Sequence, residues 1–414
     1  MKEELKRFVL ERLESVPSSP TASRALAGAL TVGQAPSLTI GVEHEFFLVA
    51  PGGDPVSHEQ GQAFLHELAK DSDWYIREQE PGFVQRVSFD DDRGRFTAVK
   101  YDHHPHLFEI AFAYENDLHR LSRQVKETLR AVTRAAERVD ARVSNNANLA
   151  LSASDPRVIS DRPEYEALRY YRSLLLRRRN QSIDPEFANY AAVIAATQTH
   201  IGGTSWWRSQ VLIPRLYALE AAIIGWTSAL ALEPGVSLEE LLKFRWRGYD
   251  AVFDGYPLVG FPNIEGWTLD SWCEALLGSP LAGGPSDPWA GLSLKSCPEN
   301  PFENWNDFIA TVRDLQIIRP KLFGTLEFRA DPAQRGAREI LAVAALRLGL
   351  TQSQLAEGLA PSQLGEARDK WWHAVRSGVV ERDPAPLELA RQGLRARGLG
   401  EEAYLSAFIP GLGG

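Results

Sequence analysis

Two glutamates flank a histidine in the segment TIGVEHEFF, whose other residues are the β-branched and aromatic types of a buried strand. Glu43 and Glu45 are two residues apart, so in a strand their side chains lie on one face and His44 lies on the other. Ionised carboxylates in an apolar strand are unfavourable unless a cation pairs with them. This face is therefore either open to water or the site of a bound cation, and we expect His44 to lie in the core or in an interface.

The same alternation occurs in three further segments that we predict to be strands. Each is apolar on one face and carries ionisable or metal-binding groups on the other. These groups are Glu109 in HLFEIAF, Gln198 and His200 in ATQTHIGG, and Glu327, Arg329 and Asp331 in GTLEFRAD. A solvated sheet face would carry scattered Lys, Thr, Ser and Glu instead of glutamates isolated in apolar runs. The four segments together predict a concave sheet whose polar face is a functional site.

Several carboxylates on one face repel one another and therefore require positive charge. Hard oxygen ligands suit Mg²⁺, with Mn²⁺ as an alternative. An arginine two residues beyond a carboxylate suits a phosphate held beside the metal. Together these groups are the components of phosphoryl transfer from a nucleotide. The sequence has no P-loop and no G-x-G-x-x-G after a predicted strand, so we expect a nucleotide to bind through its metal ions.

The composition is that of an ordinary globular protein. The chain has 414 residues, of which 44% are hydrophobic and 24% charged, and its formal net charge is −9, so we expect no nucleic-acid partner. Cys273 and Cys297 are far apart and form no C-x-x-C motif, which favours reduced thiols in the cytoplasm. The N-terminal segment is amphipathic, unlike a signal peptide, and no apolar run has membrane-spanning length. We therefore expect a soluble, cytoplasmic protein without a membrane partner.

Strands separated by helices predict an α/β or α+β fold. We predict strands within 38–50, 82–100 (a hairpin with DDDRG as its turn), 107–113, 141–146, 191–203 and 321–332. We predict helices at 2–16, 60–70, 116–140, 163–179, 213–232 and 337–350, followed by a helical remainder. The segment 213–232 is apolar nearly all round and is expected to be a buried central helix. Residues 233–305 are rich in Pro, Gly and Trp and are expected to be loops over the site, or a small insertion.

Five segments resemble, in their order along the chain, the glutamate–cysteine ligase family. They are GVEHEFFLV, FEIAF before a long helix, RPEYEALRYY, TQTHIGG before an apolar helix, and RPKLFGTLEFRADP. Over about residues 38–350 the chain is similar to the bacterial carboxylate–amine ligases of the second glutamate–cysteine ligase type, with some plant-type features. The resemblance implies an α+β, glutamine-synthetase-like fold. Its curved, largely antiparallel sheet would form a funnel, with helices packed outside.

The resemblance also implies an activity and roles for individual residues. Members of the family use ATP and Mg²⁺ to convert a carboxylate, typically of glutamate, into an acyl phosphate, from which an amine such as that of cysteine displaces the phosphate. By position, the implied metal ligands are Glu43, Glu45, Glu109 and Glu327. Arg329 matches the arginine that contacts the transferring phosphate, and Arg319 is a weaker match for another phosphate or substrate contact. With Glu327, Arg329 is thus a candidate catalytic residue, and a homodimer is common among family members.

The sequence departs from the family pattern where substrates would bind. Gln198 stands where the bacterial ligases have the first histidine of H-V-H-V-G, although the plant type also has glutamine there. His200 remains, either as a ligand or substrate contact or as a structural histidine. Residues 146–148 (NAN) replace the bacterial T-H-P motif, and Pro105 replaces a polar residue. These changes bear on the acid and the amine more than on ATP chemistry, and the sequence identifies no general base.

The resemblance divides the chain into an N-terminal helical segment (1–36), a catalytic domain (37–350, with 233–305 as its cover) and a C-terminal helical extension (351–414). Three weaker features have two interpretations each. They are His103, His104 and His106, as a metal site or a loop rim; Arg177, Arg178 and Arg179, as phosphate contacts or a solvated helix end; and Trp206 and Trp207, as a cover for a substrate or as packing. Two other functions stay open, namely a metal-dependent phosphotransferase or hydrolase on the same scaffold and a catalytically degenerate, nucleotide-binding partner protein.

Overall fold

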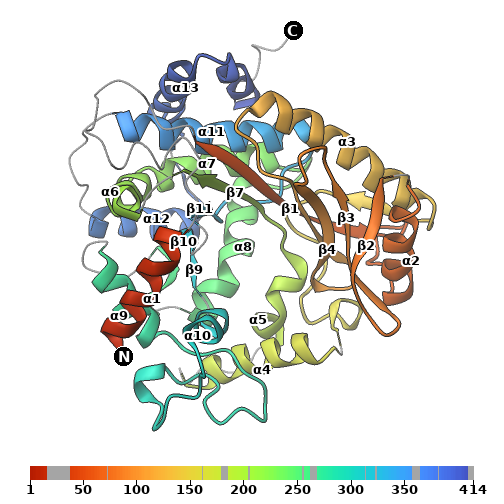
Figure 1. Ribbon diagram of the computed structural model, residues 1–414. Coiled ribbons are helices and arrows are strands. Elements are labelled where there is room, and N and C mark those ends of the chain that lie inside the picture. Colours follow the sequence, from red (N-terminus) through yellow and green to blue (C-terminus); the bar gives the residue numbers. More distant parts are fainter. Residues whose placement is uncertain are drawn as a thin grey trace.

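A long strand, β1 (Thr39–Val49), runs through the centre of the structure, which is a computed structural model (Figure 1). The residues described are 1–15, 38–71, 73–160, 162–178, 185–203, 206–253, 256–261, 268–312, 314–321, 324–356, 364–380 and 382–408. Within β1, Val42, Phe46 and Leu48 are buried in the main core, which agrees with the alternation read from the sequence.

The central sheet has nine strands. Its order is β10 (Ile318–Lys321), β11 (Thr325–Phe328), β7 (Thr197–Gly202), β1, β5 (Leu107–Ala111), β4 (Phe96–His104), β3 (Phe83–Asp90) and β2 (Trp74–Glu80), and β6 (Arg142–Ser144) pairs with the end of β1. Every described pairing in this sheet is antiparallel. The mixed fold with a large antiparallel sheet is thus confirmed, whereas the funnel shape stays a prediction.

Helices lie on both sides of the sheet (Figure 1). The helices α2 (His58–Leu68), α3 (Leu118–Glu137) and α11 (Ala337–Ala356) pack with the apolar face of the strands in the main core. On the other side, α4 (Pro163–Arg178), α5 (Pro185–Asn189) and α8 (Leu238–Phe253) pack on one another, and α4 and α8 line a cavity together with Glu45. These helices therefore cover the polar face of the sheet near Glu45.

The remaining elements surround this core. They are α1 (Lys2–Ser15), α6 (Trp206–Tyr217), α7 (Glu220–Ala231), α9 (Leu269–Gly278), α10 (Trp305–Thr311), α12 (Leu364–Ser377), α13 (Ala385–Arg397), the short parallel pair β8 (Val259–Gly260) and β9 (Leu315–Gln316), and four 3₁₀ segments at Pro156–Val158, Tyr190–Val193, Leu294–Ser296 and Glu401–Phe408. None of the helices in the described ranges combines the length and the apolar character needed to cross a membrane.

The helix α3 forms where its apolar periodicity predicts it. Leu118, Leu121, Val125 and Val132 are buried along one side, and the Asp117 side chain caps the first turn by accepting a hydrogen bond of 2.7 Å from the His119 amide. The hairpin of β3 and β4 also forms as predicted, with the turn between Asp90 and Phe96.

The prediction of one central helix over 213–232 is wrong, because the segment is divided into α6 and α7. Ala218 and Leu219 form a turn between the two helices, and Glu220 then starts α7 with its side chain fully buried. Residues 233–305 also contain α8 and α9, which the loop-rich interpretation did not predict. The side chains of His103, Trp206 and Trp207, and all of Arg179, lie outside the described residues.

A second correction concerns Asp331, which we expected to share a face with Glu327 and Arg329. β11 ends at Phe328, so the alternation of a strand no longer applies, and Asp331 pairs with Arg347 of α11 instead. The Arg347 guanidinium donates to Asp331 at 2.8 and 2.9 Å and also pairs with Glu220. All three side chains are at most 1% exposed. This buried ion triad ties α7 and α11 to the segment that follows β11.

Replacing Arg347 by methionine should lower the free energy of unfolding by about 3–5 kcal/mol, because two carboxylates would remain buried without their cation. The loss should be smaller at acid pH, where Glu220 can take up a proton; burial already raises its pKa to about 7 despite Arg347. Urea unfolding at two pH values measures both effects. Arg391→Met is the matched control, since it removes an exposed helix pair with Glu388 and should change stability by less than about 0.5 kcal/mol. An equal effect of the two substitutions would contradict the prediction.

Candidate active site

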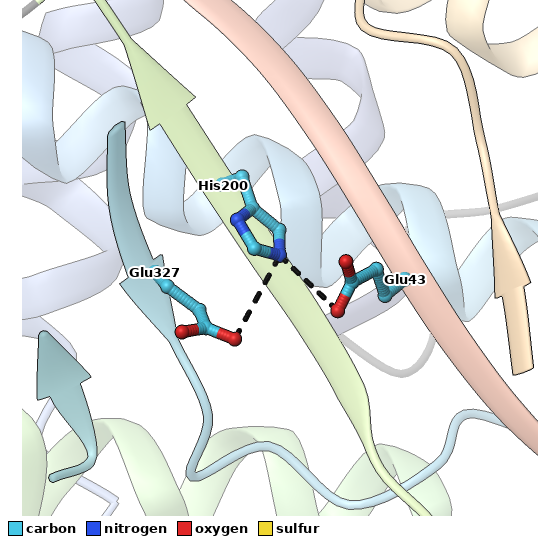
Figure 2. A group of neighbouring side chains, drawn as sticks. All are labelled: Glu43, His200 and Glu327. Carbon is cyan, nitrogen blue, oxygen red and sulfur yellow. Dashed lines mark ion pairs between the residues drawn. The ribbon is translucent and has the colours of Figure 1, made fainter. Parts of the chain in front are cut away.

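The register of the strands brings the first group of site residues together. Glu327 on β11 is the Cα partner of Arg319 on β10 and of His200 on β7. His200 in turn faces Gly41 on β1, which has no side chain, and Glu43 two residues on projects from the same face of β1. Figure 2 shows Glu43, His200 and Glu327 pointing toward one another. The Nε2 atom of His200 lies 3.4 Å from Glu43 Oε2 and 3.9 Å from Glu327 Oε1.

A second group forms one row further along the strands. Glu45 on β1 is the partner of Glu109 on β5, and Glu109 is the partner of Lys100 on β4. Lys100 Nζ lies 2.9 Å from Glu109 Oε1. The alternation of β4 puts Asp102 on the same face as Lys100, and oxygens of Glu45, Asp102 and Glu109 come within 4.8 Å of one another. Three carboxylates and one lysine thus gather here.

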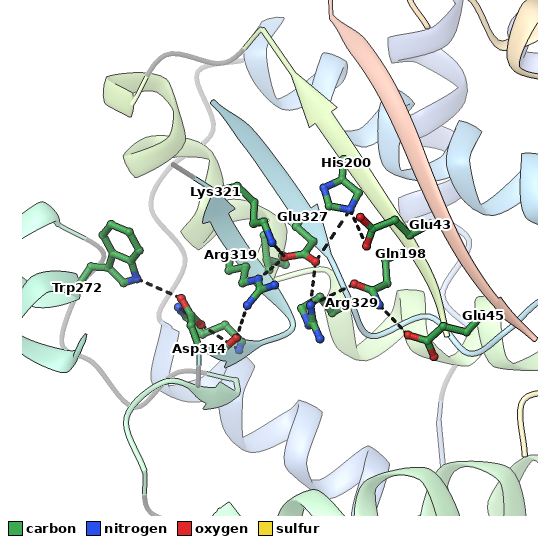
Figure 3. A network of polar contacts seen from close by, with 12 residues as sticks. Glu43, Glu45, Gln198, His200, Trp272, Asp314, Arg319, Lys321, Glu327 and Arg329 are labelled. Carbon is green, nitrogen blue, oxygen red and sulfur yellow. Dashed lines mark hydrogen bonds and ion pairs between the residues drawn. The ribbon is translucent and has the colours of Figure 1, made fainter. Parts of the chain in front are cut away.

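Glu327 is surrounded by cations. Its side chain is 1% exposed, and it pairs with Arg319, with Lys321 Nζ at 3.5 Å and with Arg329 Nη1 at 2.8 Å. Arg329 Nη1 also donates to Gln198 Oε1 at 3.1 Å, and Gln198 Nε2 donates to Glu45 Oε1 at 2.9 Å (Figure 3). Gln198 therefore links the two groups and fixes the orientation of Arg329.

The electrostatics of the two groups are opposite. In the first group, burial raises the pKa of Glu43, but the hydrogen bond and charge of His200 outweigh it and lower that pKa to about 2. Burial likewise raises the pKa of Glu327, yet Arg329, Arg319 and Lys321 hold it well below its usual value. Both carboxylates are therefore ionised at neutral pH. The three cations around Glu327 outnumber the two carboxylates of the group.

In the second group three carboxylates share one lysine, so positive charge is in deficit. Burial, with the charge of Asp102, raises the pKa of Glu45 to about 8 although Arg245 and Arg329 oppose the shift. Burial and the charge of Glu43 raise the pKa of Glu109 well above its usual value despite Lys100. A bound cation would relieve this deficit.

The donor sets fit divalent metal ions. Ligand atoms of Glu43, His200 and Glu327 also lie within 4.8 Å of one another. Carboxylate oxygens with at most one imidazole suit Mg²⁺ or Mn²⁺. In the second group, Glu109 Oε1 is buried. Lys100 Nζ forms an ion pair with this oxygen, but its geometry does not meet the angles of a hydrogen bond. An under-coordinated buried oxygen of this kind is available to a metal.

Every predicted site residue lies in this one region. The set comprises Glu43, Glu45, Glu109, Gln198, His200, Arg319, Glu327 and Arg329. Their proximity is a feature of the structure, while their roles toward metal, phosphate and substrate stay predictions.

Other residues of the site were missed. Lys100 and Asp102 follow the same two-residue alternation as Glu43 and Glu45, so the segment AVKYDHH carried a signal that could have found them. Lys321 stands two residues after Arg319 and could have been found likewise. Arg172 on α4 and Arg245 on α8 line the cavity beside Glu45. Because they come from helices, no spacing in the sequence relates them to the strands.

The weaker candidates lie elsewhere. His44 is fully buried on the opposite face of β1, with its ring nitrogens 3.0 Å from Thr197 Oγ1 and 3.1 Å from Asn145 Oδ1. His106 Nε2 contacts the Ala192 carbonyl at 2.8 Å, and the His104 ring stacks on His106, so neither belongs to the two groups described above. The Arg178 side chain binds the Gly291 carbonyl.

The sequence matches no protein-family model and no curated protein. Among solved structures, a bifunctional glutathione synthetase from Pasteurella multocida aligns with 90% of this chain at 10% identity and a TM-score of 0.48. GmaS without ligand and a GmaS/ADP complex each align with 96% of the chain, at 14% and 16% identity and TM-scores of 0.32 and 0.33. The chain spans 47% of the length of the synthetase and 70% of each GmaS chain. At these TM-scores the likeness assigns neither a fold family nor a reaction.

The affinity for Mn²⁺ should rise with pH at least up to about 8, the pKa of Glu45, by roughly tenfold per pH unit for each proton displaced. The reason is that the metal must replace the protons that the raised pKa values of Glu45 and Glu109 retain. Calorimetric titration at a series of pH values measures this slope. Glu45→Gln should make the slope shallower, and an affinity of the wild-type chain that is independent of pH would refute the prediction.

Proposed function

We propose that the protein is an ATP- and Mg²⁺-dependent carboxylate–amine ligase that forms an amide through an acyl phosphate. The observation that carries the proposal is the polarity of the site. A cluster of cations, Arg319, Lys321 and Arg329, adjoins an acidic cluster. In the acidic cluster, Glu45, Asp102 and Glu109 share a single lysine. Phosphate binds favourably at the first, and a divalent ion at the second.

Divalent ions bound to these carboxylates would supply positive charge to the phosphates of the nucleotide. The contribution of the chain is orientation. Arg329 is held by Glu327 on one side and by Gln198 on the other, so its guanidinium is pre-organised to stabilise charge that develops on the transferred phosphoryl group. Arg319 is fixed by Glu327 and by the Asp314 carbonyl at 2.6 Å.

The acid that receives the phosphoryl group would occupy the cavity that Glu45, Gln198 and Arg329 line together with residues of α4 and α8. Aromatic and aliphatic side chains in its wall would keep water from the acyl phosphate, which water would otherwise hydrolyse. In the finer form of the proposal, the acid is glutamate and the product is a γ-glutamyl amide of cysteine or of another amine. The order of motifs along the sequence supports this form.

The proposal is tested by incubating the protein with ATP, Mg²⁺, glutamate and a panel of amines while ADP, phosphate and amide are measured. Amide should form in step with ADP. A phosphorylated product without amide would identify a phosphotransferase, phosphate release without amide a hydrolase, and no ADP with any acid and amine would refute catalysis of this kind.

Glu327→Gln should reduce turnover by roughly a hundredfold or more, because it removes a ligand candidate and releases Arg329 and Arg319 from their shared partner. Glu239→Gln, on the exposed side of α8, is the matched control and should retain wild-type turnover. Equal rates for the two variants would contradict the role of Glu327.

A further inference from the structure

The guanidinium of Arg319 is held at two of its three nitrogens. Its Nε pairs with Glu327, and its Nη1 donates to the backbone carbonyl of Asp314 at 2.6 Å. Within the described part of the chain, its Nη2 has no hydrogen-bond partner. The side chain is 18% exposed, which leaves Nη2 available to a ligand at the cationic end of the site. The direction of this nitrogen therefore depends on where the Asp314 carbonyl lies.

The side chain of Asp314 fixes the backbone that carries this carbonyl. Its Oδ1 accepts hydrogen bonds from the amide and from Nε2 of Gln316, at 3.2 and 2.9 Å, and thereby forms an Asx turn. Its Oδ2 accepts a longer bond, of 3.4 Å, from Nε1 of Trp272 on α9 (Figure 3). Gln316, Trp272 and Asp314 are 0%, 3% and 9% exposed. The carboxylate is thus enclosed, and its contacts lie within the protein.

The chain beyond β9 is held by other contacts. The Ile317 amide donates to the Gly260 carbonyl at 3.0 Å, and the Ile317 carbonyl accepts from the Arg329 amide at 2.8 Å. These bonds join β8, β10 and β11 without the Asp314 side chain. We therefore expect that side chain to fix the position of its own carbonyl, and through it Arg319, more than the sheet or Arg329.

We propose that Asp314 is a positioning residue that, together with Trp272, aims the Arg319 guanidinium at a phosphate group of the nucleotide. The inference deepens the proposed function and rests on it for the identity of the ligand. Asp314 does not touch the ligand. It orders Arg319 before the ligand binds, so that binding does not have to restrict this long side chain. Through Trp272, α9 acts on phosphate affinity although it contributes no charge to the site.

Variants at position 314 test the proposal by calorimetry with Mg²⁺ and a non-hydrolysable ATP analogue. Asp314→Ala leaves both Gln316 donors without their acceptor and should weaken binding by roughly 3–10-fold, the effect of having to order one long side chain. Asp314→Asn retains an oxygen for Gln316 and should restore most of the affinity. Trp272→Phe keeps an aromatic ring and should weaken binding less than Asp314→Ala, because the bond that it removes is long. The matched control is Asp307→Ala, an exposed aspartate of α10, which should bind like the wild type.

A double-mutant cycle shows whether Asp314 acts through Arg319. Arg319→Met alone should weaken binding of the analogue by about tenfold or more. Adding Asp314→Ala to it should then change the affinity by less than about twofold, because the side chain that Asp314 positions is already absent. A merely structural residue would lower the affinity by the same factor in both backgrounds, and that result would overturn the proposal.

Nuclear magnetic resonance of the ligand-free chain, labelled with ¹⁵N at arginine, makes the test independent of nucleotide binding. The Nε–H signal of Arg319, identified by its loss in Arg319→Met, should shift or broaden in Asp314→Ala and return in Asp314→Asn. The Nε–H signal of Arg347, which donates to Asp331 at 2.9 Å, should stay unchanged and reports an intact fold. Trp272→Phe gives a second reading with a smaller change of structure, and the Arg319 signal should shift there by less.

The outcomes separate this inference from the proposed function. An Arg319 signal that is unchanged in both Asp314→Ala and Trp272→Phe would refute the positioning role even if the protein forms ADP and amide. A chain that binds no nucleotide but shows the shift would instead refute the proposed function, and with it the phosphate as ligand, and would retain the control of Arg319 by Asp314.

Discussion

The need to neutralise carboxylates buried on one face of the sheet is the constraint on which the rest of the site depends. Antiparallel pairing makes Glu45 a direct neighbour of Glu109, and Glu43 projects beside them from the same strand. The chain compensates this charge unevenly, with three cations around Glu327 and one lysine at Glu109. The opposite pKa shifts of the two groups follow directly from that imbalance, which makes one end of the site cationic and the other acidic.

Much of this arrangement could be predicted from the sequence because a strand repeats every two residues. An isolated glutamate in an apolar strand has only one orientation that keeps the apolar face buried, so Glu43, Glu45, Glu109 and Glu327 could be assigned to one face without knowledge of the strand order. What the sequence does not contain is the pairing of distant strands. The registers that join Glu327 to His200, and Glu45 to Glu109, are decided by the packing of the whole sheet.

Two of the predictions that failed concern residues that pair with a distant charge. Strand alternation would put Asp331 beside Arg329, but β11 ends three residues earlier and Arg347 draws the carboxylate to the other side. Glu220, at the start of α7 in the apolar segment 213–232, is likewise paired with Arg347. Neither partner is near in sequence, so hydrophobic periodicity could not indicate the break between α6 and α7.

The helices over the polar face differ from the strands in what they contribute. The strand residues around Glu327 supply charges that compensate one another within the protein, whereas Arg172 and Arg245 bring positive charge that the described protein groups do not pair. Folding without a ligand therefore retains an electrostatic cost that a bound anion would remove. The cost falls at the wall of the cavity, on α4 and α8, and not at the cations that surround Glu327.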